Sequence, residues 1–251
     1  MNRRWISMEQ SKGAADDRVR HTKSGLAIAL SDVMFKWRGG VGFKLEVPEF
    51  TVGAEEKVLL LGESGSGKST LLSLICGIIM PTKGDVTVQG TELNQLSRRR
   101  RDRFRADNIG VIFQQFNLLP YATPLENILL PLRFSPRRRA RVDNPRYEAL
   151  GLARALGLSD HLVAGSLASE LSVGQQQRVA VARAMIGQPP LIVADEPTSA
   201  LDASAQAAFL DLLFYQISEV RSTLLMVSHD GRLGGHFDRV FDLGSVMCVQ
   251  T

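Results

Sequence analysis

Short apolar runs alternate along the chain with longer stretches that carry apolar residues at helical spacing. Strands are expected at residues 26–37, 43–52, 58–61, 85–89, 109–113, 191–194 and 224–227. Helices are expected at residues 70–80, 125–132, 146–156, 175–186 and 204–220. Pro48 marks the second strand as an edge or irregular strand, because proline has no N–H to donate. Strands that alternate with helices predict an α/β fold around a mainly parallel sheet.

The first 25 residues are polar, mixed in charge and without periodicity, so we expect a flexible extension there. The remaining residues, 26–251, form one predicted domain. No apolar stretch approaches the roughly 20 residues that a membrane span needs. The N-terminus also lacks the apolar core of a secretory signal. A role at a membrane would therefore need another chain to bring the protein there.

Composition and charge change this picture little. The 251 residues are 44% hydrophobic, enough for a well-buried core, and the net charge of +4 favours anionic partners without selecting one. Cys76 and Cys248 lie far apart and form no metal-binding spacing, which favours a reducing compartment. Two arginine clusters, at 98–105 and 137–141, are interpreted as solvated helix faces or loops. Contact with anionic lipid headgroups is the alternative.

One segment fits the phosphate-binding pattern G-x-x-x-x-G-K-[ST] between a predicted strand and a predicted helix. It consists of Gly62, Glu63, Ser64, Gly65, Ser66, Gly67, Lys68 and Ser69. The glycines let successive backbone N–H groups converge on one anion, and the helix start adds its positive dipole end. Lys68 is expected to reach the β- and γ-phosphates and Ser69 to ligate Mg²⁺. An ordinary glycine-rich loop before a core helix is the weaker reading.

Two further segments extend the site. The apolar run 191–194 ends in Asp195 and Glu196. Asp195 is expected near Mg²⁺, and Glu196, pointing the other way on the pleat, near an attacking water. Ser172 and Gly174 at a helix start form a second anion site. A single γ-phosphate does not need two anion sites in one chain, so the second is expected to serve a nucleotide held by another subunit.

From residue 26 to residue 249 the chain resembles the ATP-binding subunits of ABC transporters. Besides the segments above, Gln114 matches the family's Q-loop, Asp202 its D-loop and His229 its switch histidine. Trp37 stands where the family usually has a tyrosine that stacks on adenine. Each match alone is weak. Singly, Gln114 could be a surface amide, His229 a core histidine and Trp37 a packing residue. Their order and spacing make the resemblance specific.

The resemblance implies a P-loop nucleotide-binding domain with a mainly parallel core sheet, an antiparallel β subdomain and a helical subdomain at about 115–175. By the same resemblance, residues from Gly62 to Thr70 bind ATP, and Ser69, Gln114 and Asp195 serve Mg²⁺. Glu196 is the general base, and His229 contacts the γ-phosphate. The signature residues that bind the facing subunit's γ-phosphate are Ser172, Val173, Gly174 and Gln175, and Asp202 helps to join the two halves.

Two residues depart from the family pattern. Val173 replaces the first glycine of the usual signature, so the turn must be one that a β-branched residue tolerates. Leu167 stands where many relatives have proline. Variants at the position of Val173 occur in the family, so ATP hydrolysis is still expected.

The implied function is that of a motor subunit which dimerises head to tail around ATP and drives transmembrane permease chains. A soluble ABC-type ATPase that acts on nucleic acid or ribosomes is the less favoured alternative, and a P-loop kinase or GTPase does not need the signature segment. The stretch 108–132 resembles the ATPases of lipoprotein-release, macrolide-efflux and cell-division systems. Export or mechanical transmission is therefore favoured over import, at the cytoplasmic face of the inner membrane. Apolar residues after Gln114 are expected to line a groove for a partner helix, with core packing as the alternative: Phe116, Leu118, Leu119 and Tyr121.

Overall fold

The computed structural model describes residues 25–37, 43–63, 65–199, 201 and 203–250. One of its two sheets is antiparallel, in the strand order β10-β2-β1-β4-β5. Its strands are β1 (Leu26–Lys36), β2 (Lys44–Gly53), β4 (Lys83–Val88), β5 (Thr91–Glu92) and β10 (Cys248–Gln250). The predicted extension at 1–25 lies outside the described residues except for Gly25.

The other sheet is parallel throughout, in the order β6-β7-β8-β3-β9. Its strands are β6 (Ile109–Ile112), β7 (Leu191–Asp195), β8 (Thr223–Ser228), β3 (Lys57–Leu61) and β9 (Arg239–Asp242). Both faces of β7 and β8 are covered, so these strands read as continuous apolar runs. The predicted α/β architecture with its parallel core is confirmed.

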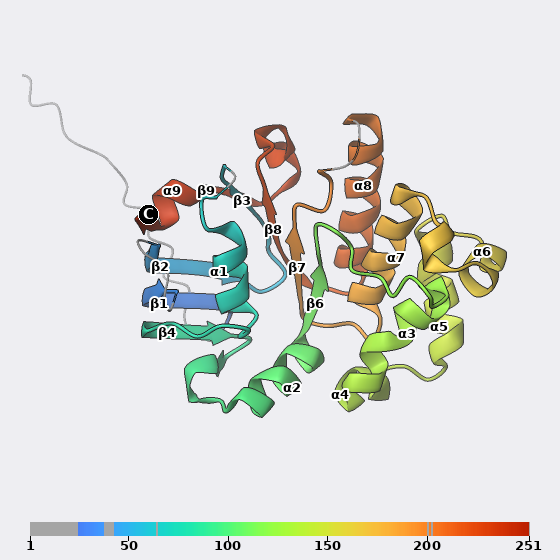
Figure 1. The fold of residues 1–251 in the computed structure, drawn as a ribbon, viewed down its shortest axis with the longest axis horizontal. Helices are drawn as coiled ribbons and strands as arrows, with labels where there is room; N and C mark the ends of the chain where they lie inside the picture. Colours follow the sequence, from blue (N-terminus) through green and yellow to red (C-terminus); the bar gives the residue numbers. More distant parts are fainter. Residues whose placement is uncertain (1–24, 38–42, 64, 200, 202, 251) are drawn as a thin grey trace, which may run out of the picture.

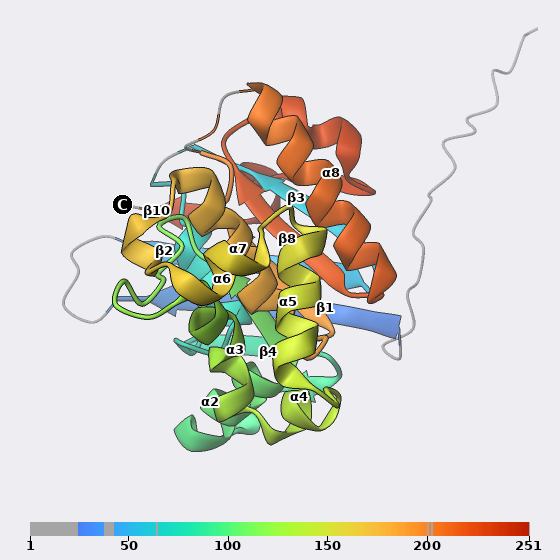
Figure 2. The same cartoon turned by 90° about the vertical axis from the view of Figure 1, so that its right-hand side faces the viewer.

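Helices lie between the two sheets and on the outer face of the parallel sheet. They are α1 (Lys68–Ile75), α2 (Arg98–Asn108), α3 (Pro124–Phe134), α4 (Pro136–Ala140), α5 (Pro145–Ala155), α6 (Asp160–Gly165), α7 (Val173–Met185), α8 (Ala203–Glu219) and α9 (Leu243–Val246). Short 3-10 helices lie at Leu93–Gln95, Ala168–Glu170 and Gly231–His236. Helix α1 lies between the two sheets, whereas α3, α5, α6 and α7 gather on the far side of the parallel sheet (Figure 1, Figure 2).

The parallel sheet separates two apolar cores. Along β7, Leu191 and Val193 pack into the core shared with α1 and the antiparallel sheet. Ile192 and Ala194 pack into the core shared with the helices on the other face. This alternation follows from the two-residue period of a strand. The sheet is therefore held on both sides, which fixes the positions of its strand ends.

One local expectation is wrong, and two others are confirmed. The helix after the phosphate-binding loop ends at Ile75 rather than near residue 80, because the chain turns at Gly77 with φ of 63°. Pro48 lies in β2 beyond the stretch that pairs with β10, so the strand has a free side there, as an edge position requires. The arginine cluster at 98–105 is a regular helix, α2, begun by a Ser97 cap. The turn expected at Gly39-Gly40 lies outside the described residues.

Strand β6 and the end of helix α7 approach each other closely at Gly110. A Cβ atom at this position would lie 2.2 Å from the main-chain oxygen of Ala184 and 2.7 Å from Ile192 Cδ1. Only a residue without a side chain permits this contact between strand and helix. The contact fixes α7 against the edge strand of the parallel sheet.

We therefore expect Gly110→Ala to lower the free energy of unfolding by about 1–3 kcal/mol, because the helix must shift to admit the methyl group. Gly151→Ala is the matched control, since a Cβ atom there meets nothing within 4 Å on helix α5. Denaturant titration of both variants measures the difference. Equal stability of the two variants would contradict a tight contact at Gly110.

Candidate nucleotide-binding site

The phosphate-binding loop joins β3 to α1, as the sequence predicts. Gly67 precedes the helix with φ of 91°, a left-handed conformation that glycine adopts at little cost. Lys68 is the first helical residue and its side chain is only 7% exposed. Helix α1 therefore begins within the motif, with its unpaired N–H groups at the loop.

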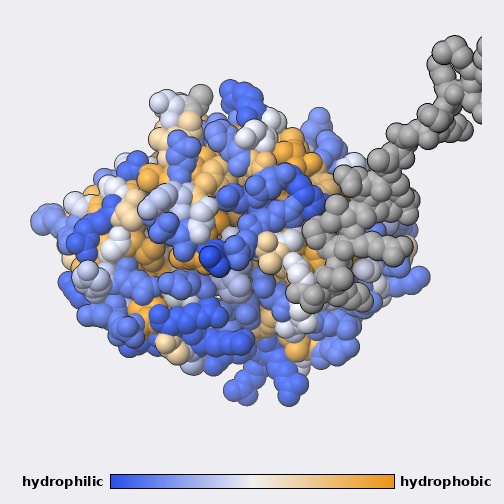
Figure 3. Space-filling model, turned by 180° about the vertical axis from the view of Figure 1, so that it is seen from behind, coloured by the Kyte–Doolittle hydropathy of each residue, from blue (hydrophilic) through white to orange (hydrophobic). Residues whose placement is uncertain are grey.

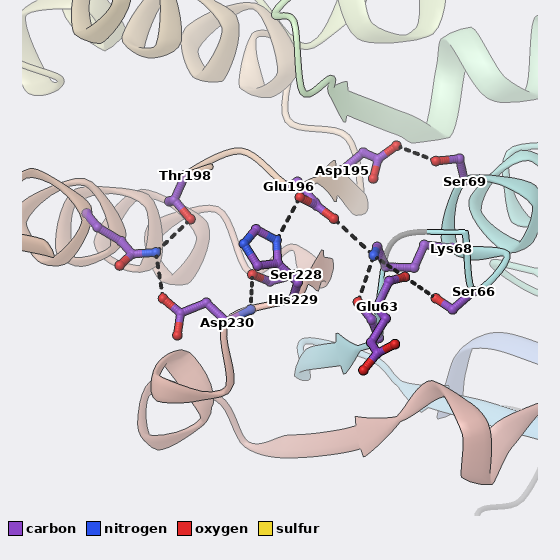
Figure 4. Close-up of polar contacts among 12 residues, drawn as sticks. Glu63, Ser66, Lys68, Ser69, Asp195, Glu196, Thr198, Ser228, His229 and Asp230 are labelled. Atoms are coloured by element: carbon purple, nitrogen blue, oxygen red, sulfur yellow. Dashed lines mark hydrogen bonds and ion pairs between the residues drawn. The ribbon is translucent and has the colours of Figure 1, made fainter. Parts of the chain in front are cut away.

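The ammonium group of Lys68 is held by three oxygens (Figure 4). It donates to the main-chain oxygens of Gly62 at 2.7 Å and Glu63 at 2.8 Å. It also forms an ion pair with Glu196 Oε1 at 3.0 Å. Carbonyl and carboxylate oxygens therefore surround the Lys68 ammonium, which the sequence predicts to bind phosphate oxygens.

The two carboxylates after β7 engage different partners. Asp195 Oδ2 accepts a hydrogen bond from Ser69 Oγ at 3.1 Å, whereas Glu196 turns to Lys68 and His229. Strand alternation is not the full reason for their divergence. Glu196 lies just beyond the strand with φ of 44°, and its N–H donates to the main-chain oxygen of Val227. The strained left-handed turn aims the carboxylate at the loop.

His229 follows β8 and lies 2.9 Å from Glu196 Oε2 through its Nδ1 atom. Its ring is 57% exposed, so it is open to a ligand from the solvent side. Neighbouring contacts tie its strand end to helix α8. The Asp230 N–H donates to Ser228 Oγ, and the Gln206 amide of α8 donates to Asp230 Oδ2 at 3.5 Å and to Thr198 Oγ1 at 3.0 Å.

The environment shifts the pKa values of both carboxyls. Partial burial raises the pKa of Glu196, but hydrogen bonds from Lys68 and His229 outweigh it, so the net pKa lies below the ordinary value. Burial raises the pKa of Asp195, and the hydrogen bond from Ser69 offsets part of that rise. The site therefore holds Glu196 ionised and next to two potential cations.

A cavity of about 310 Å³ lies beside these groups. The residues that line it are Phe43, Gly65, Gly67, Lys68, Ser69, Thr70, Gln114, Asp195 and Glu196. Gln114 thus joins the site from the segment after β6, as the sequence predicts. Its side chain is exposed and faces the same space as the carboxylates.

The sequence analysis missed Phe43, which lines the cavity at the start of β2. Trp37, the residue expected to stack on adenine, is not among the lining residues. It is 48% exposed and packs edge to face against Phe35, with ring centroids 5.0 Å apart. Its role toward adenine stays a prediction. An aromatic residue on the far side of the Gly39-Gly40 turn was the signal that could have identified Phe43.

The signature segment forms the start of helix α7. Ser172 caps the helix and Gln175 returns the bond, with N–H to oxygen distances of 3.3 Å and 2.9 Å. Val173 is the first helical residue, where a β-branched side chain needs no positive φ. This explains how valine replaces the usual glycine. The Leu167 N–H donates to Glu170 at 2.9 Å, a bond that proline could not make.

The four apolar residues of which some were expected to line a partner groove differ in exposure. Phe116 is buried and Leu118 and Leu119 are partly buried, so packing against the core explains them. Tyr121 is 75% exposed. An apolar hollow of about 460 Å³ lies between α2, α3 and β6, with Ile78, Phe113 and Phe134 among its lining residues. The chain turns inward at Phe116, which is buried, and a partner contact of Leu118, Leu119 or Tyr121 stays a prediction.

Comparison with known proteins identifies the family of the chain. Residues 45–199 match the family model of the ABC transporter. The chain belongs to the ABC transporter family. The matched span contains the phosphate-binding loop, Gln114, the signature segment and both carboxylates.

Individual relatives agree with the family. An uncharacterized ABC transporter ATP-binding protein of Mycobacterium tuberculosis is 41% identical over 220 residues, 86% of each chain. The lipoprotein-releasing system ATP-binding protein LolD of Hydrogenovibrio crunogenus is 38% identical over 225 residues, covering 88% of this chain and 94% of that protein.

A solved structure shares the fold. The ATP-binding cassette MJ0796 of Methanocaldococcus jannaschii was solved as a dimer in a post-hydrolysis state bound to ADP and Pi. It superposes on this ABC protein with a TM-score of 0.74 and 34% identity, over 86% of this chain and 93% of that chain.

The chain is thus an ATP-binding subunit of the ABC transporter type, and its reaction is ATP hydrolysis. In the part that the structure describes, no helix has the length and apolar character needed to cross a membrane. Ser64 of the loop and Asp202, assigned to the D-loop, lie outside the described residues. The division into subdomains and the individual residue roles stay predictions.

Proposed function

We propose that two copies of the chain join head to tail around two ATP molecules, each held between Lys68 of one copy and Ser172 of the other. One observation carries this proposal. The nucleotide cavity contains the loop, Gln114 and both carboxylates, but no residue of the signature segment. Val173 is 50% exposed at the free end of α7, and Gly174 faces open space. The signature site is thus available to a neighbouring chain.

Within this joint site the chain's own groups have separate tasks. Lys68 leaves Glu196 and its carbonyl partners to bind the β- and γ-phosphates. Glu196, freed from that ion pair and held by its turn, accepts a proton from the attacking water. His229 contacts the γ-phosphate from the solvent side and keeps Glu196 oriented. Loss of the γ-phosphate removes the link between the two copies, and they separate.

The residues at the cavity fit a magnesium ion. Ser69 Oγ and Asp195 Oδ2 are 3.1 Å apart, and Gln114 lines the same space, which gives three hard oxygen donors. Mg²⁺ would neutralise phosphate charge there. We assign it to Ser69, Asp195 and Gln114, the last two directly or through water.

Replacement of the base tests the mechanism. We expect Glu196→Gln to lower kcat by roughly 10²–10⁴-fold, because the amide cannot accept the proton. The variant should remain a dimer in the presence of ATP, since the γ-phosphate persists. Phosphate release and sedimentation velocity measure the two effects. Glu219→Gln, at an exposed position on α8, is the control and should behave as wild type.

Near-normal turnover of Glu196→Gln would contradict the assignment of the base. A separate result would contradict the proposal that two copies form each site. A turnover per chain that is independent of protein concentration and unaffected by Ser172→Glu would show that one copy suffices.

We further propose that the chain drives transmembrane permease partners at the cytoplasmic face of the inner membrane, for export, lipoprotein release or mechanical transmission. The relative LolD is named for lipoprotein release, which supports this direction. The partner contact is assigned to the apolar hollow between α2, α3 and β6, because exposed Phe134 and Ile78 lie at it. A short cytoplasmic helix of a permease suits such a hollow.

Phe134→Asp should reduce co-purification of membrane chains from detergent extracts, because a carboxylate would be buried at the contact. ATP binding by the isolated variant should be unchanged. Tyr121→Asp is the matched control, an exposed aromatic residue away from the hollow. Equal retention of partners by both variants would contradict this placement of the interface.

The exposed arginines of α2 support a contact with anionic lipid. Arg98, Arg99 and Arg100 form no ion pair within the described residues, and hydrophilic side chains line the margin of the molecule where α2 and α4 lie (Figure 3). Each basic residue near an anionic surface contributes about 1 kcal/mol. Flotation should therefore recover the protein with phosphatidylserine vesicles more than with phosphatidylcholine vesicles, and a triple Arg→Gln variant should lose the difference. Binding that ignores lipid charge would exclude the contact.

A further inference from the structure

Arg183 is a buried arginine near the end of helix α7, and its side chain bonds to the segment that follows Gln114. The residue is 8% exposed. Its Nη1 donates to the main-chain oxygen of Asn117 at 2.7 Å, and its Nη2 donates to that of Phe116. Within the described residues, these side-chain hydrogen bonds go to carbonyls and not to a carboxylate. Burial lowers the pKa of Arg183.

The two acceptor residues have an uncommon backbone conformation. Phe116 and Asn117 have φ of 56° and 49°, left-handed values that asparagine tolerates but that cost about 1 kcal/mol or more for a bulky residue such as Phe116. The conformation presents two successive carbonyl oxygens to one guanidinium. The planar fork of arginine can donate to both oxygens at once, whereas the ammonium of lysine cannot match them in the same plane. The guanidinium therefore stabilises a strained turn.

The position of this turn makes the contact relevant to the reaction. Gln114, which lines the nucleotide cavity, lies two residues before Phe116, and the Phe116 N–H closes the turn on the carbonyl of Phe113. At the other end, α7 begins at the signature residue Ser172, about 16 Å from Arg183 along the helix axis. One side chain thus joins the cavity segment to the helix that carries the signature.

We propose that Arg183 is a positioning residue for ATP hydrolysis, which sets the placement of Gln114 by fixing the Phe116–Asn117 turn to helix α7. This inference rests on the proposed role of Gln114 at the joint site. Arg183 also lines the hollow assigned to the membrane partner, together with Phe113. A partner segment bound in that hollow would contact the same guanidinium. Arg183 would then link the partner, the segment that carries Gln114 and the helix that carries the signature.

A double-mutant cycle on the full chain tests the proposal. Arg183→Lys keeps the charge but loses the fork, so we expect kcat to fall roughly tenfold. The KM for ATP should change by less than about twofold, because Arg183 does not line the nucleotide cavity. If Arg183 acts through Gln114, the double variant with Gln114→Ala should turn over no more slowly than Gln114→Ala alone.

Arg138 provides the matched control. It is 2% exposed on α4, bonds to the main-chain oxygens of Ala184 and Ile186 at the end of the same helix, and lines the same hollow. It makes no bond to Phe116 or Asn117 in the described structure. The losses from Arg138→Lys and Gln114→Ala should therefore multiply. Thermal unfolding of every variant shows that the kinetic effects are measured on folded protein.

Three results would overturn the proposal. The first is an unchanged kcat in Arg183→Lys, and the second is a double variant Arg183→Lys/Gln114→Ala whose loss of kcat equals the product of the two single losses. The third is a double variant Arg138→Lys/Gln114→Ala that turns over no more slowly than Gln114→Ala alone. If Arg183→Lys does not fold, hydrogen exchange of the wild-type protein tests whether the Gln114 segment and helix α7 are linked. ATP and Mg²⁺ should change protection of residues 114–117 and of the end of α7 together. A change at 114–117 alone would refute the link.

This failure is distinguishable from failure of the proposed function. Loss of turnover in Glu196→Gln with a normal Arg183→Lys enzyme would leave the joint ATP site standing and remove only the role of Arg183.

Discussion

The nucleotide site depends on the parallel register of three neighbouring strands, β3, β8 and β7. Leu61 pairs with Ser228, and Asp195 pairs with Val227, so the three strands end at nearly the same level. Lys68, His229 and Glu196 each follow one of these ends. Their contacts exist because apolar side chains on both faces of the sheet hold the strands in this register. A slip of one residue would reverse the faces and separate the charged groups.

In this ABC protein the charges of the site are satisfied among themselves. Lys68 is nearly buried, and a buried ammonium without acceptors would be costly. Two loop carbonyls and Glu196 supply the acceptors, and His229 shares the same carboxylate. The arrangement couples the phosphate-binding cation to the group assigned as base. Under the proposed roles, a triphosphate that binds Lys68 would release Glu196, which would link nucleotide binding to activation of the base.

Helix α7 joins the remaining parts. Its first residues carry the signature, its middle bonds to the loop after β7 through Gln177, and its end packs on Gly110. Two buried guanidiniums, Arg138 and Arg183, hold its C-terminal end. Arginine is suited to this task because its planar donors satisfy several carbonyls at once. The helix therefore contacts both the turn after Gln114 and the loop that follows β7.

The sequence by itself determined the α/β class, most strands, the phosphate-binding loop and the family, because periodicity and motif spacing are local properties. It also placed Asp195 and Glu196 in the site from the end of an apolar strand, and the resemblance to the family added Gln114. Local patterns did not contain the inward turn at Phe116, the hollow beside β6 or the bonds of Arg183. These depend on contacts between residues far apart in the chain, such as Arg183 with Asn117. Only the tertiary structure decided them, because burial and left-handed backbone conformations arise from the packing of helix α7 against the sheet and not from the adjacent residues.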